Sequence, residues 1–293
     1  MRSCYFCIDI GGTKTAYAVY DETGTELFYG QFPTQPERGA DDLLERVYRA
    51  TEEVRGIYAE RLICGVIASP GPLDIPNGRI VEIATMGWKN LPLVSLFERK
   101  FGFKFYLLND CNAGALGVYE LYAKSKNSVV YVSVSTGIGG GFVIDGKLYN
   151  GKGNAAEIGH LPVAGMGLTC GCGKKDCLEL YASGTGISHR YTCLTGENLS
   201  AEGIANRARK GEKNALSVFR DAGEKLGFAL RSVVGMVDPE IIVLGGSVCK
   251  GKELFFPIAQ SYIGNTKTEF VKGEGKQVIY GAYVYAKQTV NNV

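Results

Sequence analysis

Residues 9–15, DIGGTKT, decide how the rest of the chain is interpreted, because two adjacent glycines follow directly on an apolar strand pattern. The preceding CYFCIDI is rich in β-formers and the following TAYAVYD alternates, so the glycines lie in a turn between two expected strands. Such a turn exposes backbone N–H groups to an anion, and Thr13 and Lys14 add a hydroxyl and a charge. A tight hairpin that binds nothing explains the same residues.

The same pattern returns at residues 129–151, VVYVSVSTGIGGGFVIDGKLYNG. It predicts a strand, a glycine-rich turn, a second strand, a hairpin turn at Asp145 and Gly146, and a third strand. The chain is therefore expected to contain two related halves whose glycine hairpins hold a polyphosphate from both sides. A third glycine pair, Gly245 and Gly246, follows the strand EIIVL and would let the backbone approach a nucleoside. Neither a P-loop nor a GxGxxG pattern is present.

Composition narrows the class of protein. The 293 residues are 45% hydrophobic, which is enough for one large or two ordinary domains, and we expect two. The formal net charge of +2 argues against nucleic acid or an anionic membrane as the main partner. No uninterrupted apolar segment of about 18 residues occurs. Nine cysteines, four of them within residues 170–193, indicate a reducing cytoplasm rather than a secreted disulfide framework.

Strand and helix patterns alternate along the chain, which is typical of an α/β fold. An amphipathic helix is expected from Asp41, a short helix at residues 94–102, and strands at 61–68 and 103–108. A long helical pattern covers residues 214–237 and is stopped by Pro239. The pattern of residues 281–293 also predicts a helix.

Asn109 and Asp110 stand between an apolar strand and a helical pattern in LLNDCNAGALG, residues 107–117. Both residue types are favoured as helix caps. A carboxylate in this place is also suited to accept the proton of an attacking hydroxyl. Spacing alone leaves the two interpretations open.

His160, Cys170, Cys172 and Cys177 lie within eighteen residues of one another. Three thiolates and one imidazole at this spacing predict a closed tetrahedral Zn²⁺ site of the structural kind. A group of reduced, buried thiols is the alternative. His189, beyond this motif, is expected to be solvated or to cap a helix.

These motifs resemble those of the ROK family (repressor, open reading frame, kinase) of the actin-like ATPase and sugar kinase superfamily. DIGGTKT resembles its first phosphate motif, STGIGGG its second and IIVLGG its adenosine motif, in the expected order from about residue 7 to 250. The resemblance implies two α/β actin-like ATPase (ribonuclease H-like) lobes with an interlobe cleft. It implies a small lobe of residues 1–109 plus about 281–293, and a large lobe of 110–280 with the zinc site and a dimer surface.

The resemblance also implies roles for individual residues. Asp110 is expected to be the general base, and Asp9 to hold Mg²⁺ through water. The residues expected to bind ATP and its phosphates are Asp9, Gly11, Gly12, Thr13, Lys14, Thr136, Gly137, Gly139, Gly245 and Gly246. Those expected to bind the sugar are Gly71, Asn109, Asp110, Glu157, His160 and Glu179. The zinc ligands His160, Cys170, Cys172 and Cys177 are expected to order the sugar site without performing chemistry.

The implied activity is ATP-dependent phosphorylation of the 6-hydroxyl of a hexose, with glucose favoured and N-acetylmannosamine or another N-acetylhexosamine as the alternative. Thr85 and Met86 replace the usual Asn-Leu before Gly-Trp, which puts the sugar preference in doubt, and Ser135 replaces a common Gly. Trp88 either lines the sugar pocket or is a core aromatic. ROK repressors carry an N-terminal helix-turn-helix that is not expected here, and a catalytically dead sugar-binding module would have lost Asp110 or a phosphate glycine. A cytoplasmic homodimer is expected, with no nucleic acid or membrane partner.

Overall fold

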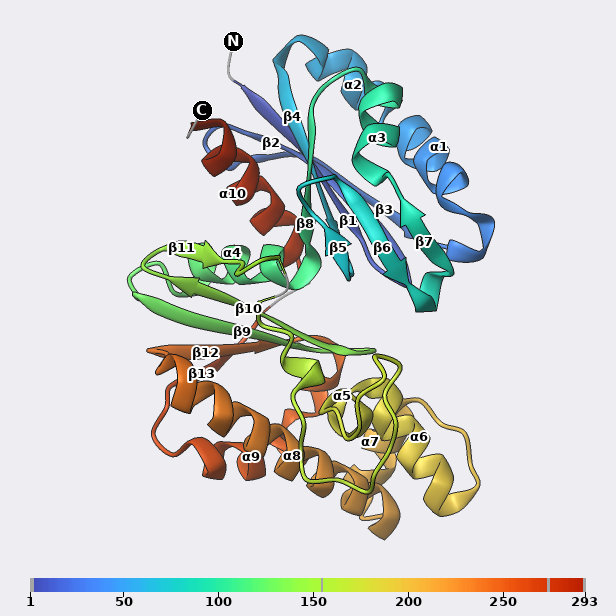
Figure 1. The fold of residues 1–293 in the computed structure, drawn as a ribbon, viewed down its shortest axis with the longest axis vertical. Helices are drawn as coiled ribbons and strands as arrows, with labels where there is room; N and C mark the ends of the chain where they lie inside the picture. The colour runs from blue at the N-terminus through green and yellow to red at the C-terminus, as the bar shows by residue number, and fades with distance from the viewer. Residues whose placement is uncertain (1–2, 154, 273–274, 292–293) are drawn as a thin grey trace. The chain divides into compact units, whose positions relative to one another are not determined.

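The computed structural model describes residues 3–153, 155–272 and 275–291 and divides into two compact units (Figure 1). The first unit holds the described residues of 1–124, 150–155 and 276–293, and the second holds those of 125–149 and 156–275. The lobes expected from the sequence, divided after residue 109, remain a proposal. In the compact units α4 (Asp110–Tyr122) belongs with the first unit, because it packs against α10 (Gln277–Asn291). The expected lobes include residues 1–2, 154, 273–274 and 292–293, which lie outside the described residues.

The first unit is built on a five-stranded sheet in the order β3-β2-β1-β4-β8. Strand β1 pairs antiparallel with β2 and parallel with β4, and β4 pairs parallel with β8, so the opening hairpin continues into a parallel sheet. A small antiparallel sheet, β5-β6-β7, follows β4 in the chain. The strands are β1 (Cys4–Ile10), β2 (Lys14–Asp21), β3 (Glu26–Pro33), β4 (Leu62–Ser69), β5 (Leu73–Asp74), β6 (Arg79–Ile83), β7 (Trp88–Leu91) and β8 (Phe105–Asn109).

Helices cover both faces of this sheet. Alternate residues of β1 point to opposite faces, so the strand packs against helices on each side. Phe6, Ile8 and Ile10 join a buried core with residues of α1 (Ala40–Ala50), α2 (Glu52–Tyr58) and α3 (Leu93–Phe101). Tyr5 meets Tyr283 of α10, with ring centroids 5.7 Å apart. Short 3₁₀ turns are η1 (Pro36–Arg38), η2 (Ala59–Arg61) and η3 (Ala84–Met86).

The prediction of a single amphipathic helix from Asp41 is wrong in one respect. The structure has two helices there, α1 and α2, on either side of Thr51. Thr51 is buried and its hydroxyl donates to the Val47 carbonyl at 2.8 Å. A buried side chain that bonds back to the preceding turn competes with the regular helix ladder. The apolar periodicity continues across this break and therefore conceals it.

Helices α4 and α10 approach each other closely enough to require glycine on both. A Cβ on Gly117 would lie 1.9 Å from the Gln277 carbonyl oxygen, and one on Gly281 would lie 1.7 Å from that of Ala113. No side chain fits at either point. The pair of glycines therefore fixes how α10 covers α4.

The second unit repeats the strand order of the first with β11-β10-β9-β12-β13. Strand β9 pairs antiparallel with β10 and parallel with β12, as β1 does with β2 and β4. The expectation of two related α/β halves is thus confirmed. The strands are β9 (Ser128–Val134), β10 (Ile138–Ile144), β11 (Lys147–Tyr149), β12 (Ile241–Gly245) and β13 (Thr268–Phe270).

Helices of the second unit gather over one face of its sheet (Figure 1). Val130 and Val132 of β9 and Leu244 of β12 share a buried core with the long helix α8 (Lys213–Val237). The remaining helical segments are η4 (Ile158–His160), α5 (Glu179–Ala182), α6 (Gly184–Thr195), α7 (Ala201–Arg209), η5 (Ser247–Leu254) and α9 (Phe256–Ile263).

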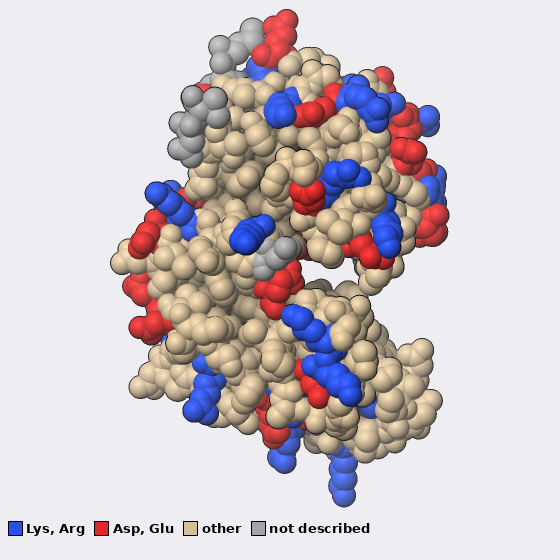
Figure 2. Space-filling view, in the orientation of Figure 1, with Lys and Arg blue, Asp and Glu red and all other residues tan. Residues whose placement is uncertain are grey.

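Among the described residues, no helix is both long and apolar enough to span a bilayer. On the face seen in Figure 2, acidic and basic side chains are interspersed on each unit. This mixture agrees with the near-zero net charge of the chain.

Candidate active site

Three parallel strands of the first unit end at one edge of its sheet, and predicted site residues lie there. The register pairs Asp9 of β1 with Ala68 of β4, and Ser69 of β4 with Asn109 of β8. The carboxyl ends of parallel strands are where open α/β sheets bind ligands. This edge therefore brings together Asp9, the loop that contains Gly71, and the residues Asn109 and Asp110.

The first glycine turn, residues 11–13, connects β1 to β2 and is held by its own backbone and by one threonine. The Gly11 N–H donates to the Lys14 carbonyl at 3.0 Å, and the Thr34 hydroxyl donates to the Gly11 carbonyl at 2.6 Å. A Cβ on Gly11 would lie 2.9 Å from the Lys14 carbonyl oxygen, whereas a Cβ on Gly12 would meet nothing within 4 Å. Gly12 and Thr13 are exposed. The tip of the turn is thus open to a ligand while its base is fixed.

Asp110 is close enough to Asp9 to affect the ionisation of Asp9. Burial raises the pKa of Asp9 to about 7. The negative charge of Asp110 adds to this rise, whereas the positive charge of Lys14 opposes it. Burial also raises the pKa of Asp110, although the N–H of Cys111 opposes this shift. Two carboxylates with raised pKa values at one sheet edge form a place for a proton or a cation.

Asn109 is the N-cap of α4, and Asp110 is its first residue. The Asn109 Oδ1 accepts from the N–H groups of Cys111 at 2.9 Å and Asn112 at 3.1 Å. Asp110 Oδ1 accepts from the Cys111 N–H at 2.8 Å. The capping interpretation therefore holds for Asn109, and it leaves Asp110 as a half-buried carboxylate at the positive end of a helix.

Gly71 lies against Asn109, since a Cβ at this position would stand 3.7 Å from the Asn109 Nδ2. Trp88 lies in the core of the first unit instead, with 6% of its surface exposed and its indole N–H donating to the Pro36 carbonyl at 3.3 Å. The core-aromatic interpretation of Trp88 is thus the one the structure favours. Of the two residues that replace the usual Asn-Leu before Gly-Trp, Met86 is buried and Thr85 is exposed.

The second glycine turn, residues 135–137, connects β9 to β10 and is supported by a carboxylate. The Ile138 N–H donates to Glu179 Oε2 at 2.9 Å, and a Cβ on Gly137 would lie 2.5 Å from that oxygen. The N–H groups of Gly184 and Thr185 also donate to the carbonyls of Ser135 and Thr136, at 2.7 and 3.2 Å. Glu179, expected on the sugar side, therefore also supports the turn that carries Thr136 and Gly137.

The third glycine pair lies beside this turn, because β12 runs parallel to β9. Gly246 has φ 96°, and a Cβ there would lie 2.3 Å from the Val134 carbonyl oxygen. The hydroxyls of Ser247 and Ser135 lie 3.2 Å apart. Gly139, on β10, pairs with Ser133 of β9. The structure thus places the stretch STGIGGG next to the stretch IIVLGG.

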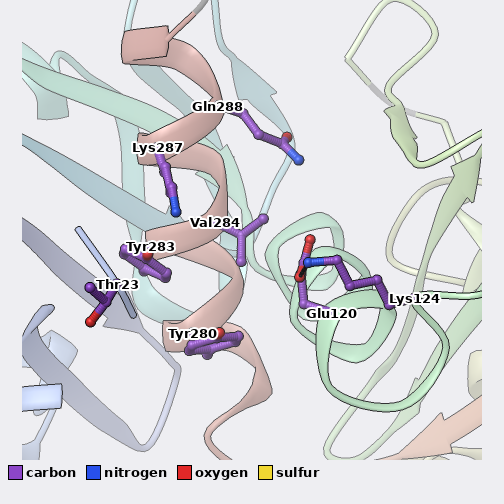
Figure 3. Close-up of a pocket in the computed structure, with 8 residues that line it drawn as sticks. All are labelled: Thr23, Glu120, Lys124, Tyr280, Tyr283, Val284, Lys287 and Gln288. Carbon is purple, nitrogen blue, oxygen red and sulfur yellow. Dashed lines mark hydrogen bonds and ion pairs between the residues drawn. The ribbon is translucent and has the colours of Figure 1, made fainter. Parts of the chain in front are cut away.

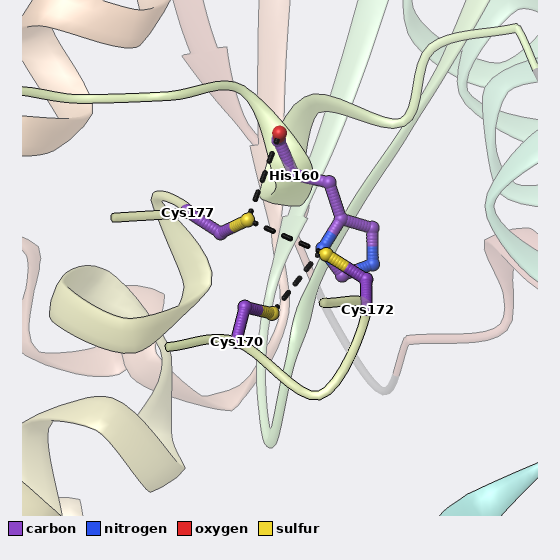
Figure 4. A group of neighbouring side chains, drawn as sticks. All are labelled: His160, Cys170, Cys172 and Cys177. Atoms are coloured by element: carbon purple, nitrogen blue, oxygen red, sulfur yellow. Dashed lines mark hydrogen bonds between the residues drawn. The ribbon is translucent and has the colours of Figure 1, made fainter. Parts of the chain in front are cut away.

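The four predicted zinc ligands converge on one point (Figure 4). Their ligand atoms all lie within 4.8 Å of one another. Cys172 Sγ lies 3.5 Å from Cys177 Sγ, and Cys170 Sγ lies 3.7 Å from His160 Nδ1. Thiolates about 2.3 Å from a tetrahedral zinc ion are about 3.8 Å apart, so the cluster is close to the spacing that this metal requires.

Backbone bridges bring the cluster together. The pair Pro162–Cys177 sets Cys177 beside His160, and the pair Thr169–Lys175 closes the turn that carries Cys170 and Cys172. Burial raises the pKa of Cys177 to about 12 and also raises that of Cys170, whereas a backbone hydrogen bond from Lys174 lowers the pKa of Cys172. The buried thiols therefore ionise only with a compensating positive charge, which a bound metal supplies.

Comparison with known proteins decides the family. The ROK family model matches residues 5–278. The chain belongs to the ROK family. It is 31% identical to the glucokinase of Thermotoga maritima over 283 residues, covering 90% of this chain and 88% of that protein. It is 32% identical to the N-acetylmannosamine kinase of Yersinia pestis over 245 residues, covering 82% of each. Its fold matches the ROK hexokinase of Thermus thermophilus with a TM-score of 0.87 and 29% identity over the whole of both chains.

Within this ROK protein, Glu157 is exposed and directly precedes η4, which ends at His160. A Cβ on Gly159 would lie 2.1 Å from the Ile138 carbonyl oxygen, so the backbone of η4 packs directly on β10. His189 lies exposed on α6, as expected for a solvated residue. Glu157, His160 and Glu179 are thus all held near β10 of the second unit.

Three further residues contact elements that carry predicted site residues, and no sequence pattern indicated them: Thr34, Asn112 and Asn150. Thr34, the residue after β3, supports the first glycine turn, and Asn112 bonds to Asn150 across 38 residues of chain. A pocket of about 320 Å³ in the first unit, between α4 and α10, contains none of the predicted site residues (Figure 3). Lys124, which lines it, is paired with Glu120 at 2.7 Å.

Proposed function

We propose that this ROK protein is an ATP-dependent sugar kinase that phosphorylates the 6-hydroxyl of a hexose, with glucose as its first substrate. The observation that carries this proposal is the position of Asp110, half-buried at the start of α4 and at the same sheet edge as Asp9 and the first glycine turn. A hydroxyl nucleophile needs a proton acceptor beside the phosphate site.

Asp110 is the proposed general base. Its carboxylate takes the proton of the sugar hydroxyl as the hydroxyl oxygen attacks the γ-phosphorus and the bond from that phosphorus to the ADP oxygen breaks. The raised pKa of Asp110 makes its carboxylate a better proton acceptor than an exposed aspartate. Asn109, held by the backbone of α4, is fixed beside it to bind the sugar.

The glycine turns are proposed to bind the phosphates of ATP. Gly12 and Thr13 present an open tip in the first unit, and Thr136 and Gly137 form the corresponding turn in the second. Gly245 and Gly246 are proposed to accommodate the nucleoside, because two residues without side chains let the backbone approach a ligand closely. Asp9 would hold Mg²⁺ through water, and the ion would neutralise charge on the phosphates.

The zinc site is proposed to be structural, held by His160, Cys170, Cys172 and Cys177. The bound ion would supply rigidity and no chemistry, since all four ligand positions come from the protein. Glu157 lies three residues before His160, and Glu179 lies two residues after Cys177. Holding these four ligands would therefore hold both proposed sugar carboxylates as well.

The test is ADP release from MgATP, screened across glucose, mannose, fructose, allose, N-acetylglucosamine and N-acetylmannosamine. Strong turnover on one sugar that is lost in Asp110→Asn supports the kinase. Lack of turnover on every sugar, by protein that contains zinc and binds ATP, contradicts it and favours a sugar sensor.

N-acetylmannosamine is the second candidate substrate. It is favoured by the 32% identity with the Yersinia pestis kinase. Thr85 and Met86, in place of the usual Asn-Leu, leave the choice of sugar open. A ratio of kcat/KM for N-acetylmannosamine over glucose above 1 would select it.

We also propose a cytoplasmic homodimer. Support for the dimer comes from large apolar side chains exposed along α8, where Leu216, Phe228 and Met236 are 42%, 43% and 69% exposed. None of the described cysteines forms a disulfide bond, which suits a reducing compartment. Light scattering over a dilution series tests the dimer, and a monomer mass at high concentration contradicts it.

A further inference from the structure

Asn112 is a buried polar side chain in the first turn of α4, two residues after Asp110. It is 1% exposed, and its Nδ2 donates to the Asn150 Oδ1 at 3.0 Å. Within the described part of the chain, its own Oδ1 is buried and has no hydrogen-bond partner. A half-satisfied buried amide costs stability compared with an apolar residue. The hydrogen bond to Asn150 is therefore the interaction that would account for a polar residue at this buried position.

Asn150 begins the segment 150–155, which belongs to the first unit although the chain on either side of it belongs to the second. The Asn150 carbonyl accepts from the N–H groups of Gly153 at 2.7 Å and Ala155 at 3.3 Å. Gly151 and Gly153 have φ values of 55° and 111°, which glycine adopts without strain. The described residues of this segment are therefore drawn together by hydrogen bonds to the Asn150 carbonyl, and the Asn150 side chain attaches them to α4.

The chain leaves this turn toward the proposed sugar residues. Glu157 follows two residues after Ala155, and His160 three residues later. That far end is fixed to β10: a Cβ on Gly140 would lie 2.9 Å from the Ala156 carbonyl oxygen, and Gly159 packs on Ile138. The path is thus held at Asn150 by α4 and at residues 156–160 by β10.

We infer that Asn112 and Asn150 form a positioning pair for the sugar site, which ties the helix that begins with Asp110 to the segment that leads to Glu157. This inference rests on the proposed function. Neither asparagine is among the proposed catalytic or sugar-binding residues. Their bond fixes the point at which the chain departs for Glu157, so its loss affects sugar binding more than phosphate binding.

Asn150→Ala is the main test, because Asn150 is half-buried and its truncation leaves no new buried cavity of consequence. The KM for the sugar is expected to rise about 3- to 10-fold, the range of one net hydrogen bond, with kcat and the KM for MgATP within 2-fold of wild type. Asn150→Asp keeps the acceptor oxygen and is expected to restore the sugar KM. The double variant Asn112→Ala/Asn150→Ala is expected to be no worse than the poorer single variant.

The matched control is Asn206→Ala, which removes an exposed amide on α7 that accepts from Arg209 at 3.0 Å. It is expected to leave both KM values unchanged. An unchanged sugar KM in Asn150→Ala, or an equal rise in the KM for MgATP, overturns the inference while the kinase assignment stands.

Hydrogen exchange separates this inference from the proposed function. The amides of Gly153 and Ala155 are expected to exchange faster in Asn150→Ala and Asn112→Ala than in wild type, whatever the wild-type protein phosphorylates. Unaltered exchange at both amides overturns the positioning pair. Wild-type protein that phosphorylates no sugar overturns the kinase instead, and the exchange measurement then decides the pair alone.

Discussion

The two glycine turns occupy the same place in sheets of the same strand order, yet they are held in different ways. The turn at 11–13 is supported by the Thr34 hydroxyl and lies beside the carboxylates Asp9 and Asp110. The turn at 135–137 is supported by the Glu179 carboxylate and by backbone donors at the start of α6. The repeated topology thus fixes where a glycine turn lies, and the neighbouring elements decide which side chains surround it.

The largest difference between the turns is expected from Asp110→Asn, because the second unit offers no equivalent base in the proposal. Turnover is expected to fall about 10²- to 10⁴-fold, the usual contribution of a positioned base, while the sugar still binds. Steady-state ADP release and calorimetric sugar binding measure the two effects. Near-normal kcat in this variant refutes the assignment of Asp110.

Removal of the metal ligand in Cys177→Ser is expected to affect the second unit alone. Elemental analysis should find about one zinc per wild-type chain and far less in the variant. The sugar KM is expected to rise about 10- to 100-fold as Glu157 and Glu179 lose their support. Cys193→Ser, an exposed thiol outside the cluster, is the control. Wild-type protein without stoichiometric zinc contradicts this account.

Alanine at the two glycines of the first turn distinguishes its base from its tip. Gly11→Ala forces a Cβ to 2.9 Å from a backbone carbonyl oxygen and is expected to cost about 1–3 kcal/mol of stability. Gly12→Ala meets nothing within 4 Å and is expected to change stability by less than about 0.5 kcal/mol. Urea unfolding measures both. A larger MgATP KM in the stable Gly12→Ala variant would show that phosphate approaches the tip, and an unchanged one would exclude it.

The smallest expected effects are changes of stability with pH. They have opposite signs for Asp9 in the first unit and Asp176 in the second. The folded-state pKa of Asp9 is raised to about 7, so its ionisation opposes folding as pH rises from about 4 to 7. Asp9→Asn is therefore expected to stabilise the metal-free protein at pH 8 by on the order of 1 kcal/mol. The full shift would correspond to about 4 kcal/mol, but the side chain is partly exposed to water.

Asp176 in the second unit behaves in the opposite way. Its carboxylate accepts from the Tyr181 hydroxyl and from the N–H groups of Gly167 and Leu168, and its pKa is lowered. Its contribution to stability is therefore present above the pKa of an unfolded aspartate, about 4, and is lost as pH falls through the lower folded value. Asp176→Asn is expected to destabilise the protein at pH 7 and to have little effect at the acid end. Thermal unfolding from pH 3 to 8 checks both aspartates, and the same sign for both contradicts the contrast.

Local patterns predicted the hairpins, the long helix α8 and the cluster of His160 with Cys170, Cys172 and Cys177, because each depends on residues near one another in the chain. The support of the second turn by Glu179 escaped prediction, since Glu179 and Ile138 are 41 residues apart. The bond between Asn112 and Asn150 spans 38 residues and has no sequence period. The break at Thr51 escaped for another reason: apolar periodicity reports which face is buried and is blind to one hydroxyl that bonds backward.

The packing of α10 on α4 has a consequence for biosynthesis. Helix α4, which contains Gly117, is synthesised early. Helix α10, which contains Gly281 and covers α4, follows the whole second unit in the chain. While the ribosome works through residues 125–275, the first unit lacks one layer of its core and Tyr5 lacks its partner Tyr283. The second unit can fold as soon as its residues emerge, whereas the first must wait for the last helix. A nascent chain stalled before residue 276 is thus expected to expose apolar surface to chaperones, although most of its sequence has already been made.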